Sequence, residues 1–206
     1  PITPDMNSPT HLPVVVETVN HVGEIVAVIA ARTKAQAVDA VELVDVEYSE
    51  LPVVTDLAAA RDGSAPVIHE ELGTNVNATW VFDSGEAGTG GSAAEAIAAA
   101  RSDPDQVVVE RTFRQQRLVP AYMEPRSTVV DPTGDQITIW SATQIPHILR
   151  TMLTLSQGIP EYQLRIIAPD VGGGFGGKLE VTPEEVATLM VARKLGKIGR
   201  ASCRER

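Results

Sequence analysis

A glycine-rich run, Val171-Gly-Gly-Gly-Phe-Gly-Gly-Lys178, constrains the fold of this chain more than any other stretch. Glycine has no Cβ, so such a run can adopt positive φ and lets a ligand approach the backbone closely. The N–H groups that such a loop exposes form a concave site suited to anions or oxo groups. The run therefore predicts a ligand-binding loop. A flexible turn is the plain alternative, and Phe175 is an unusual residue for a mere linker.

Two nucleotide-binding patterns also match these residues. Gly172 to Gly177 matches G-x-G-x-x-G, and with Lys178 the same stretch matches G-x-x-x-x-G-K. However, Leu179 stands where a phosphate-binding loop has Ser or Thr to hold magnesium. Both patterns also require a helix that opens directly on the glycines, whereas the best helix start comes later, at Thr182. A nucleotide-binding loop is therefore disfavoured.

Length and composition exclude several classes of protein. A chain of 206 residues with 43% apolar residues can form one or two globular domains, and none of its apolar runs approaches the roughly 20 residues of a membrane span. The formal charge of −10 argues against nucleic acid as a partner, because binding phosphates needs concentrated Lys and Arg. Residues 198–206 differ in character from the rest and look like translated sequencing-adapter DNA. We expect an artefact tail there and leave it out of the predicted fold; it holds Cys203, the only cysteine.

The N-terminal part is predicted to form a strand–helix–strand unit. Residues 25–31 are apolar and rich in β-branched side chains, as in a buried strand. Thr33 and Gln36 form a capping box for a helix through about Leu43, and residues 44–48 alternate as in a half-buried strand. Further on, glycines and an alanine-rich run in residues 85–104 predict a linker with one short helix.

The second half is predicted to mix strands and helices, so the fold class is α+β. We expect a strand at 107–113, a hairpin of 127–130 with 136–140, a helix from Pro146 to Gln157, a strand at 164–168, and a helix from Pro183 to about Gly196. Thr182 and Glu185 form the capping box of the last helix. Its predicted buried stripe consists of Val186, Leu189 and Met190.

Two motifs resemble one known family. Asp170–Lys178, together with Ser141-Ala-Thr-Gln-Ile-Pro-His147, is similar to the molybdenum hydroxylases, the xanthine dehydrogenase and aldehyde oxidase family. The resemblance runs from about Val19 to Lys197. It implies a small hammerhead domain in residues 1–84, a linker in 85–104, and the first part of a mixed α/β molybdopterin-binding domain in 105–197, before the artefact tail at 198–206.

The resemblance also implies a cofactor site. The glutamine that matches Gln144 hydrogen-bonds a molybdenum oxygen ligand, so Gln144 is the candidate catalytic residue, with a cap or strand-end hydrogen bond as its alternative role. The residues that match Phe175 and Gly176 lie beside the metal. The remaining expected cofactor-binding residues are Gly173, Gly174 and Gly177. No residue of this chain is expected to ligate the metal.

Other polar residues are given no chemical role from the sequence. Glu124, in Tyr122-Met-Glu-Pro125, is expected to be structural. His69 lies beside two glutamates, but a metal site needs convergent ligands, and adjacent residues on a strand point to opposite faces. His147 is expected to be a surface residue.

The function implied by the resemblance is that of a molybdenum-dependent oxidoreductase large subunit. The carbon monoxide dehydrogenase branch is favoured, because Leu179 stands where purine- and aldehyde-oxidising members often carry glutamate. Such an enzyme oxidises carbon monoxide to carbon dioxide with water as oxygen source. It uses molybdopterin cytosine dinucleotide with molybdenum, and copper held by a cysteine outside this chain. The expected partners are a flavin subunit and an iron–sulfur subunit, in the cytoplasm.

Two alternatives stay open at this point: a related hydroxylase of an aldehyde or N-heterocycle, and a non-catalytic binding fragment. In the favoured branch the copper-binding cysteine and the base glutamate lie beyond the position of Lys197. We therefore expect the chain alone to be inactive.

Overall fold

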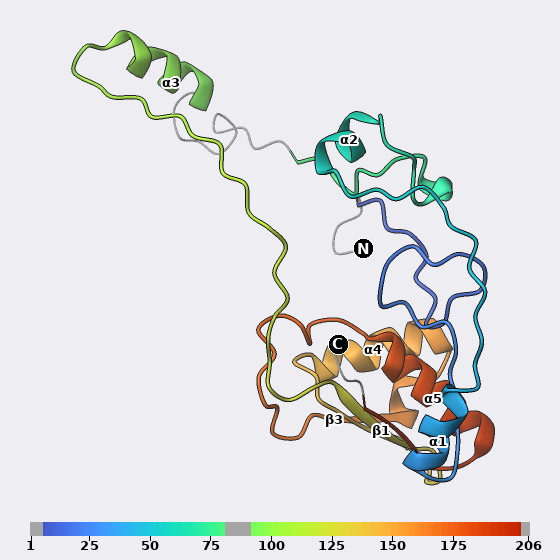
Figure 1. The fold of residues 1–206 in the computed structure, drawn as a ribbon. Helices are drawn as coiled ribbons and strands as arrows, with labels where there is room; N and C mark the ends of the chain where they lie inside the picture. The colour runs from blue at the N-terminus through green and yellow to red at the C-terminus, as the bar shows by residue number, and fades with distance from the viewer. Residues whose placement is uncertain (1–5, 81–91, 203–206) are drawn as a thin grey trace. The chain divides into compact units, whose positions relative to one another are not determined.

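The computed structural model describes residues 6–80 and 92–202 (Figure 1). The chain divides into two compact units, and each is described by itself. The first contains residues 1–9 and 52–117, and the second contains residues 10–51 and 118–206. Within the described residues, none of the helices has the length and apolar character that a membrane span requires.

The second unit is built on a four-stranded sheet with the strand order β3-β2-β1-β4. The strands are β1 (Ser127–Asp131), β2 (Ile137–Ser141), β3 (Leu164–Ile167) and β4 (Gly199–Ser202). β1 pairs antiparallel with both β2 and β4, whereas β2 and β3 run parallel. A parallel pair needs a crossover connection, which α4 (Pro146–Gln157) supplies. The predicted hairpin and the predicted strand before the glycine loop are both confirmed.

Local sequence signals set the ends of α4 and of α5 (Pro183–Leu195). Each helix begins at a proline, whose missing N–H costs no hydrogen bond in the first turn. Gly158 and Gly196 end the two helices in the left-handed conformation, with φ values of 63° and 60°. The predicted starts of both helices and the predicted end of α4 are confirmed, and α5 ends within a residue of its predicted limit.

One hydrophobic core joins these helices to the sheet. α4 packs against β3, and α5 packs against β1 and β4. The core side chains are almost completely buried: Val130, Ile139, Leu149, Leu153, Ile159, Leu164, Leu189 and Ala192. The predicted stripe of α5 is partly wrong, because Met190 is 49% exposed although Leu189 is buried and Val186 packs against the core. Adjacent residues lie about 100° apart around a helix, so Met190 and Leu189 do not share a face.

β4 lies within residues 198–206, which the sequence analysis left out of the predicted fold. Gly199 pairs with Val130, and Arg200 pairs with Val129. Strand pairing uses backbone N–H and C=O groups, which almost every residue provides, so side-chain character did not reveal it. Leaving these residues out of the fold was therefore wrong, whereas their origin stays a prediction.

Three predicted strands do not form: residues 25–31, 44–48 and 107–113 lie outside any strand. An apolar run becomes a strand only where a neighbour pairs with its N–H and C=O groups. In the described part of the chain, the run 25–31 has one such bond to a distant residue, from Val15 N–H to Ile25 O at 2.8 Å. The helix between the first two runs does form as α1 (Lys34–Val41), with Thr33 as its N-cap.

The first unit contains short helices. They are α2 (Leu57–Asp62), the 3₁₀ helix η1 (Glu70–Leu72) and α3 (Ala93–Ser102). Ser92 and Glu95 form a capping box at the start of α3, which confirms the short helix predicted in the alanine-rich run. Residues 81–91 of the predicted linker lie outside the described residues.

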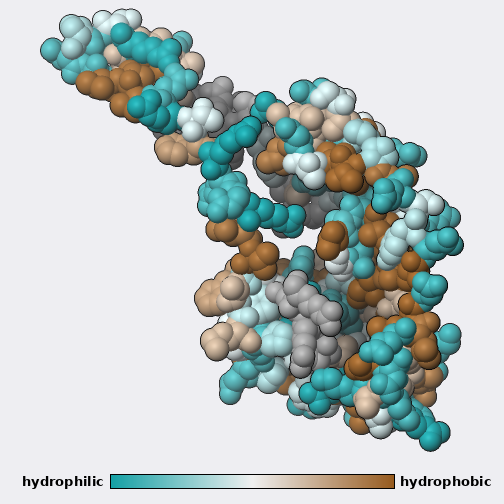
Figure 2. Space-filling view, in the orientation of Figure 1, coloured by the Kyte–Doolittle hydropathy of each residue, from teal (hydrophilic) through white to brown (hydrophobic). Residues whose placement is uncertain are grey.

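Brown patches of hydrophobic side chains reach the visible surface of the molecule (Figure 2).

Candidate functional site

Sheet topology brings the two predicted parts of the site together. β2 and β3 are parallel neighbours, so the segments that follow them leave the sheet at the same edge. Gln144 follows β2, and the glycine loop, residues 171–178, follows β3. A backbone hydrogen bond joins the two segments, from Gln144 N–H to the carbonyl of Lys178 at 3.0 Å.

The backbone of the glycine loop is strained at its tip. Positive φ occurs at Gly173 (91°), Phe175 (49°) and Gly176 (87°), and Phe175 is the one non-glycine residue with positive φ in the described part of the chain. For a residue with a Cβ this conformation costs about 1–2 kcal/mol. The residue is 76% exposed, so burial of its ring does not offset the cost. Strain held in this way is typical of loops shaped for a ligand.

Gly174 lies directly against Gln144. A Cβ at this position would stand 2.5 Å from Cδ of Gln144, closer than side-chain carbon atoms can approach. The residue is buried, so the loop has no room to move away from the carboxamide. The contact explains why glycine is needed at position 174 and fixes the loop beside Gln144.

Several hydrogen-bond donors at this contact are unpaired. Oε1 of Gln144 accepts from Lys178 N–H at 3.3 Å, and its NH₂ group has no partner among the described residues. The N–H groups of Gly174, Phe175 and Gly176 likewise have no partner within the described ranges. Backbone and carboxamide donors in a fixed arrangement suit an anionic or oxo ligand. We call these four donor groups the donor row.

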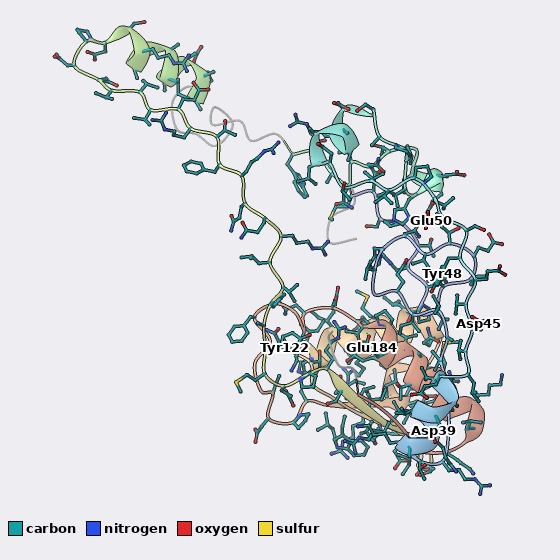
Figure 3. The ribbon with its side chains drawn as sticks, in the orientation of Figure 1. Asp39, Asp45, Tyr48, Glu50, Tyr122 and Glu184 are labelled. Carbon is teal, nitrogen blue, oxygen red and sulfur yellow. The ribbon has the colours of Figure 1, made fainter. Side chains whose placement is uncertain are left out.

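The lysine of the loop points into the protein. Lys178 is 1% exposed, and its Nζ lies 2.9 Å from Oε2 of Glu124 and 4.7 Å from the ring centroid of Tyr122. Tyr122 lies in the segment that leads into β1 (Figure 3). In a phosphate-binding loop the lysine instead contacts the ligand phosphates. This geometry therefore argues against the nucleotide-binding interpretation of the glycines.

Glu124 connects to the start of the loop as well. Its Oε2 accepts a hydrogen bond from Gly172 N–H at 2.6 Å in addition to the bond from Lys178. These two bonds, that of Lys178 first, hold the pKa of Glu124 below its usual range. Sequence reasoning missed the pairing, because 54 residues separate the partners and no local pattern links them.

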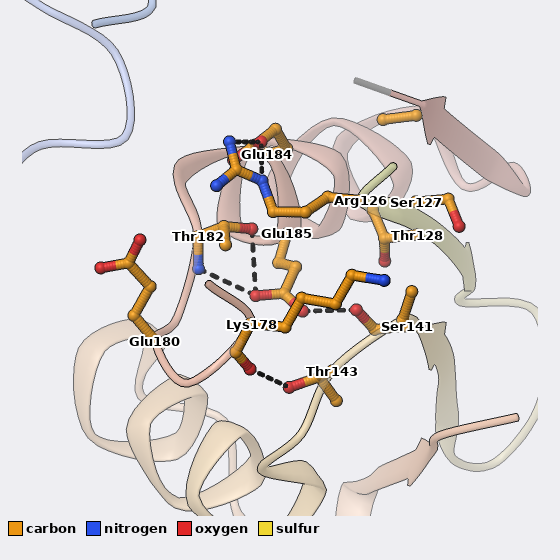
Figure 4. A pocket seen from close by; sticks show the side chains of 12 residues that line it. Arg126, Ser127, Thr128, Ser141, Thr143, Lys178, Glu180, Thr182, Glu184 and Glu185 are labelled. Carbon is orange, nitrogen blue, oxygen red and sulfur yellow. Dashed lines mark hydrogen bonds and ion pairs between the residues drawn. The ribbon is translucent and has the colours of Figure 1, made fainter. Parts of the chain in front are cut away.

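A small polar pocket lies beside Lys178, between β1, β2 and the start of α5 (Figure 4). In this pocket the carboxylate of Glu185 accepts hydrogen bonds from the hydroxyl of Ser141 and from Thr182 N–H, the latter at 2.8 Å. Burial raises the pKa of Glu185 despite these bonds. The buried hydroxyl of Thr128, which also lines the pocket, has no partner in the described structure. The capping box was predicted, but the contact of Glu185 with Ser141 was not.

Neither histidine considered above lies in the donor row. Nδ1 of His69 is 3.8 Å from the carboxylate of Glu71 in the first unit. Residues 6–80 and 92–202 contain no group of three His, Cys, Asp or Glu side chains placed to hold a metal ion. His147 is exposed in the first turn of α4 and lines a shallow pocket with Arg150 and Arg165.

Comparisons with known proteins find two matching family models. Residues 68–202 match the molybdopterin cofactor-binding domain, and residues 2–52 match the a/b hammerhead domain of aldehyde oxidase and xanthine dehydrogenase. The first match includes β1 to β4, Gln144 and the whole glycine loop.

Similar proteins are known in sequence and in structure. The carbon monoxide dehydrogenase large chain of Hydrogenophaga pseudoflava is 34% identical over 186 residues, which cover 84% of this chain and 22% of the relative. The crystal structure of quinoline 2-oxidoreductase from Pseudomonas putida 86 aligns with a TM-score of 0.70 at 34% identity, over 84% of this chain and 21% of that one. A structure of Cu,Mo-CO dehydrogenase aligns with a TM-score of 0.67 at 27% identity, over 83% and 22%. The chain thus spans about a fifth of the length of these relatives.

Proposed function

Because the chain belongs to the molybdopterin cofactor-binding domain family, we propose that its donor row contributes to a molybdopterin site. The donor row comes from Gln144, Gly174, Phe175 and Gly176. Gly173 and Gly177, whose N–H groups bond within the loop, are proposed to line the same site. The observation that carries the proposal is the set of N–H groups at residues 174–176 beside the NH₂ group of Gln144, all without a hydrogen-bond partner among the described residues. These groups fit a cofactor rich in oxygen atoms, since all of them donate and none carries a charge that would need a counter-ion.

Gln144 is proposed to orient and stabilise an oxygen atom through its NH₂ group. The carboxamide is fixed for this role, because Lys178 N–H occupies Oε1 and Gly174 packs against Cδ. When bound, a molybdenum cofactor supplies two-electron redox chemistry. The protein side of the site would contribute a neutral donor held in place before any ligand arrives, which lowers the reorganisation needed when charge develops on the oxygen.

The activity proposed for the complete protein is oxidation of carbon monoxide to carbon dioxide with water as oxygen source. The similarity to a carbon monoxide dehydrogenase large chain and to Cu,Mo-CO dehydrogenase supports it. The similarity to quinoline 2-oxidoreductase supports the second candidate, hydroxylation of an N-heterocycle or an aldehyde. Under the first candidate the cofactor is molybdopterin cytosine dinucleotide, with copper bound by a cysteine outside this chain.

The proposed assembly is a cytoplasmic complex of a large subunit with flavin and iron–sulfur subunits. Within the large subunit, residues 1–84 would form the hammerhead domain, 85–104 the linker, and residues from 105 onward the cofactor domain. The hammerhead match over residues 2–52 falls within the proposed hammerhead domain, whereas the cofactor-domain match starts at residue 68, before the proposed linker.

The test is Gln144→Ala in the complete large subunit with its partner subunits. Loss of one preorganised donor is expected to lower kcat by about 10²- to 10³-fold. Melting temperature and molybdenum content should stay near those of the wild type. Gln157→Ala, which changes a glutamine at the other end of α4, is the matched control and should keep full activity.

The alternative role of Gln144 as a structural cap predicts the reverse pattern. A capping side chain contributes about 1 kcal/mol to stability and nothing to the reaction. Normal turnover together with a lowered melting temperature would therefore reject the proposed site. Assays with carbon monoxide and with quinoline separate the two candidate activities.

A further inference from the structure

We infer that Glu124 and Lys178 are positioning residues that form a clamp on the glycine loop and thereby set its backbone donors beside the carboxamide of Gln144. The role of the clamp in cofactor binding rests on the proposed function. Its effect on the shape of the glycine loop does not depend on that proposal. The clamp has three members: the carboxylate of Glu124, the ammonium of Lys178 and the ring of Tyr122.

One oxygen atom of the clamp holds both ends of the loop. Oε2 of Glu124 accepts from Gly172 N–H at 2.6 Å, where the loop begins, and from Nζ of Lys178 at 2.9 Å, where the loop ends. Gly172 is in contact with the same side chain, because a Cβ there would stand 2.6 Å from Cβ of Glu124. The loop between these two points contains the N–H groups of residues 174–176, which have no partner in the described part of the chain. The shape of the loop is therefore held by Glu124, a residue that lies outside the loop.

The clamp also reaches Gln144 through the backbone of Lys178. The N–H of Lys178 donates to Oε1 of Gln144 at 3.3 Å, and its carbonyl accepts from Gln144 N–H at 3.0 Å. The side chain of Lys178 thus anchors the residue whose backbone orients the candidate catalytic carboxamide. Losing the ammonium would release the residue whose backbone bonds to both the N–H and Oε1 of Gln144.

Burial distinguishes this ion pair from an ordinary surface pair. Exposed pairs contribute little because water and salt screen them. Here the Lys178 side chain is 1% exposed and that of Glu124 is 33% exposed. Removing Glu124 would leave an ammonium without a counter-ion in the interior, which is strongly unfavourable. The lowered pKa of Glu124 agrees with a carboxylate held in its charged form.

The same unit offers a matched control ion pair whose two residues lie outside the glycine loop. Arg126 and Glu184 form an ion pair at 3.0 Å with side chains 27% and 12% exposed. It joins the residue before β1 to the first turn of α5. Breaking it tests the cost of losing a partly buried ion pair without changing the clamp.

The test is site-resolved amide hydrogen exchange on the chain without any cofactor. The variants are Lys178→Met, Glu124→Ala, Glu124→Gln and the control Glu184→Gln. A hydrogen bond to a charged group stabilises by an amount that corresponds to about 10- to 100-fold in opening. Lys178→Met and Glu124→Ala should therefore accelerate exchange at Gly172 and Lys178 by about that factor. Exchange in β1 and β2 should stay slow.

The remaining variants make the result specific. Glu124→Gln should recover most of the protection of Gly172, because its carbonyl oxygen still accepts that N–H. Glu184→Gln should leave the loop amides unchanged. Unchanged exchange at Gly172 and Lys178 in both Glu124→Ala and Lys178→Met would overturn the clamp, as would equal acceleration in Glu184→Gln. If Lys178→Met does not fold, the pair Glu124→Ala and Glu124→Gln decides alone. Since no cofactor is present, this outcome is independent of the turnover of Gln144→Ala.

Discussion

The carboxylate of Glu185 is 5% exposed and lies between α5 and β2, where Ser141 and Thr182 donate to it. Burial raises its pKa above the ordinary value of 4.5, which describes the unfolded chain. Above pH 4.5 and up to the raised value, the folded chain binds more protons at this residue than the unfolded chain does. By linkage, the contribution of Glu185 makes the free energy of unfolding fall as the pH rises through this window.

Glu185→Gln should remove this part of the pH dependence. The carboxamide can still accept from Thr182 N–H and can donate to the hydroxyl of Ser141, so the fold is kept. Urea unfolding between pH 4 and pH 8 should show a variant that gains stability relative to the wild type as the pH rises, by at most about 1.4 kcal/mol per pH unit. The exposed Glu180→Gln is the control and should follow the wild type. Parallel curves for wild type and Glu185→Gln would show that folding does not shift the pKa of Glu185.

At the scale of elements, α4 and α5 each end at a glycine in the left-handed conformation. Gly158 has φ of 63° and donates its N–H to the carbonyl of Thr154 at 3.0 Å, which closes the last turn of α4. α4 contributes Leu149 and Leu153 to the core and supplies the crossover between β2 and β3. A change at its end should therefore be transmitted to the stability of the whole unit.

Gly158→Ala is expected to destabilise the second unit by about 1–2 kcal/mol, because alanine in the left-handed region places its Cβ against the backbone. The matched control is Gly134→Ala in the β1–β2 turn, where φ lies outside the positive range and the nearest non-neighbouring atom is 3.5 Å from the added Cβ. That change should alter the free energy of unfolding by less than about 1 kcal/mol. Equal urea midpoints for the two variants would contradict this account of the cap.

Elements with local signals could be predicted from sequence, and elements that depend on distant partners could not. The start of α5 follows from Thr182, Pro183 and Glu185, all within four positions. By contrast, residues 25–31 have the composition of a strand but find no strand partner in the described part of the chain, and β4 has an unremarkable composition but pairs with β1. Strand pairing depends on which other segment lies beside a strand in the folded chain. The composition of the strand itself does not determine this neighbour.

The candidate site divides in the same way. The glycine loop stands out as a run in the sequence, and the role expected for Gln144 came from resemblance to a family. The contact between Gly174 and Gln144 follows from the parallel arrangement of β2 and β3, which no single motif contains. The bond from Lys178 to Glu124 spans 54 positions and required the structure.

At the scale of the molecule, the described chain offers hydrogen-bond donors but no set of metal ligands. The donor row belongs to two neighbouring segments, and residues 6–80 and 92–202 contain no group of three metal-ligating side chains. A cofactor is held by contacts that bury most of its surface. The chain spans about a fifth of the length of its relatives, so the other walls of the proposed site would come from elsewhere in the complete subunit.

The isolated chain is therefore expected to retain no molybdopterin and to be inactive. When it is expressed in a host that makes the cofactor, elemental analysis should find far less than one molybdenum atom per chain. The complete large subunit, produced in the same host with its partner subunits, is the positive control. Stoichiometric molybdenum in the isolated chain would show that residues 1–206 suffice to bind the cofactor.

The parallel pairing of β2 with β3 has a consequence for how the sequence of this chain can evolve. The clamp, the candidate catalytic carboxamide, the crossover helix and the glycine loop all lie between Tyr122 and Glu185, in one uninterrupted stretch. A recombination event that exchanges this stretch would carry the whole arrangement with its internal supports. Insertions within α5 or β4 would disturb it, because α5 packs against β1 and β4 pairs with β1. The stretch can therefore be inherited as one unit while the surrounding chain diverges.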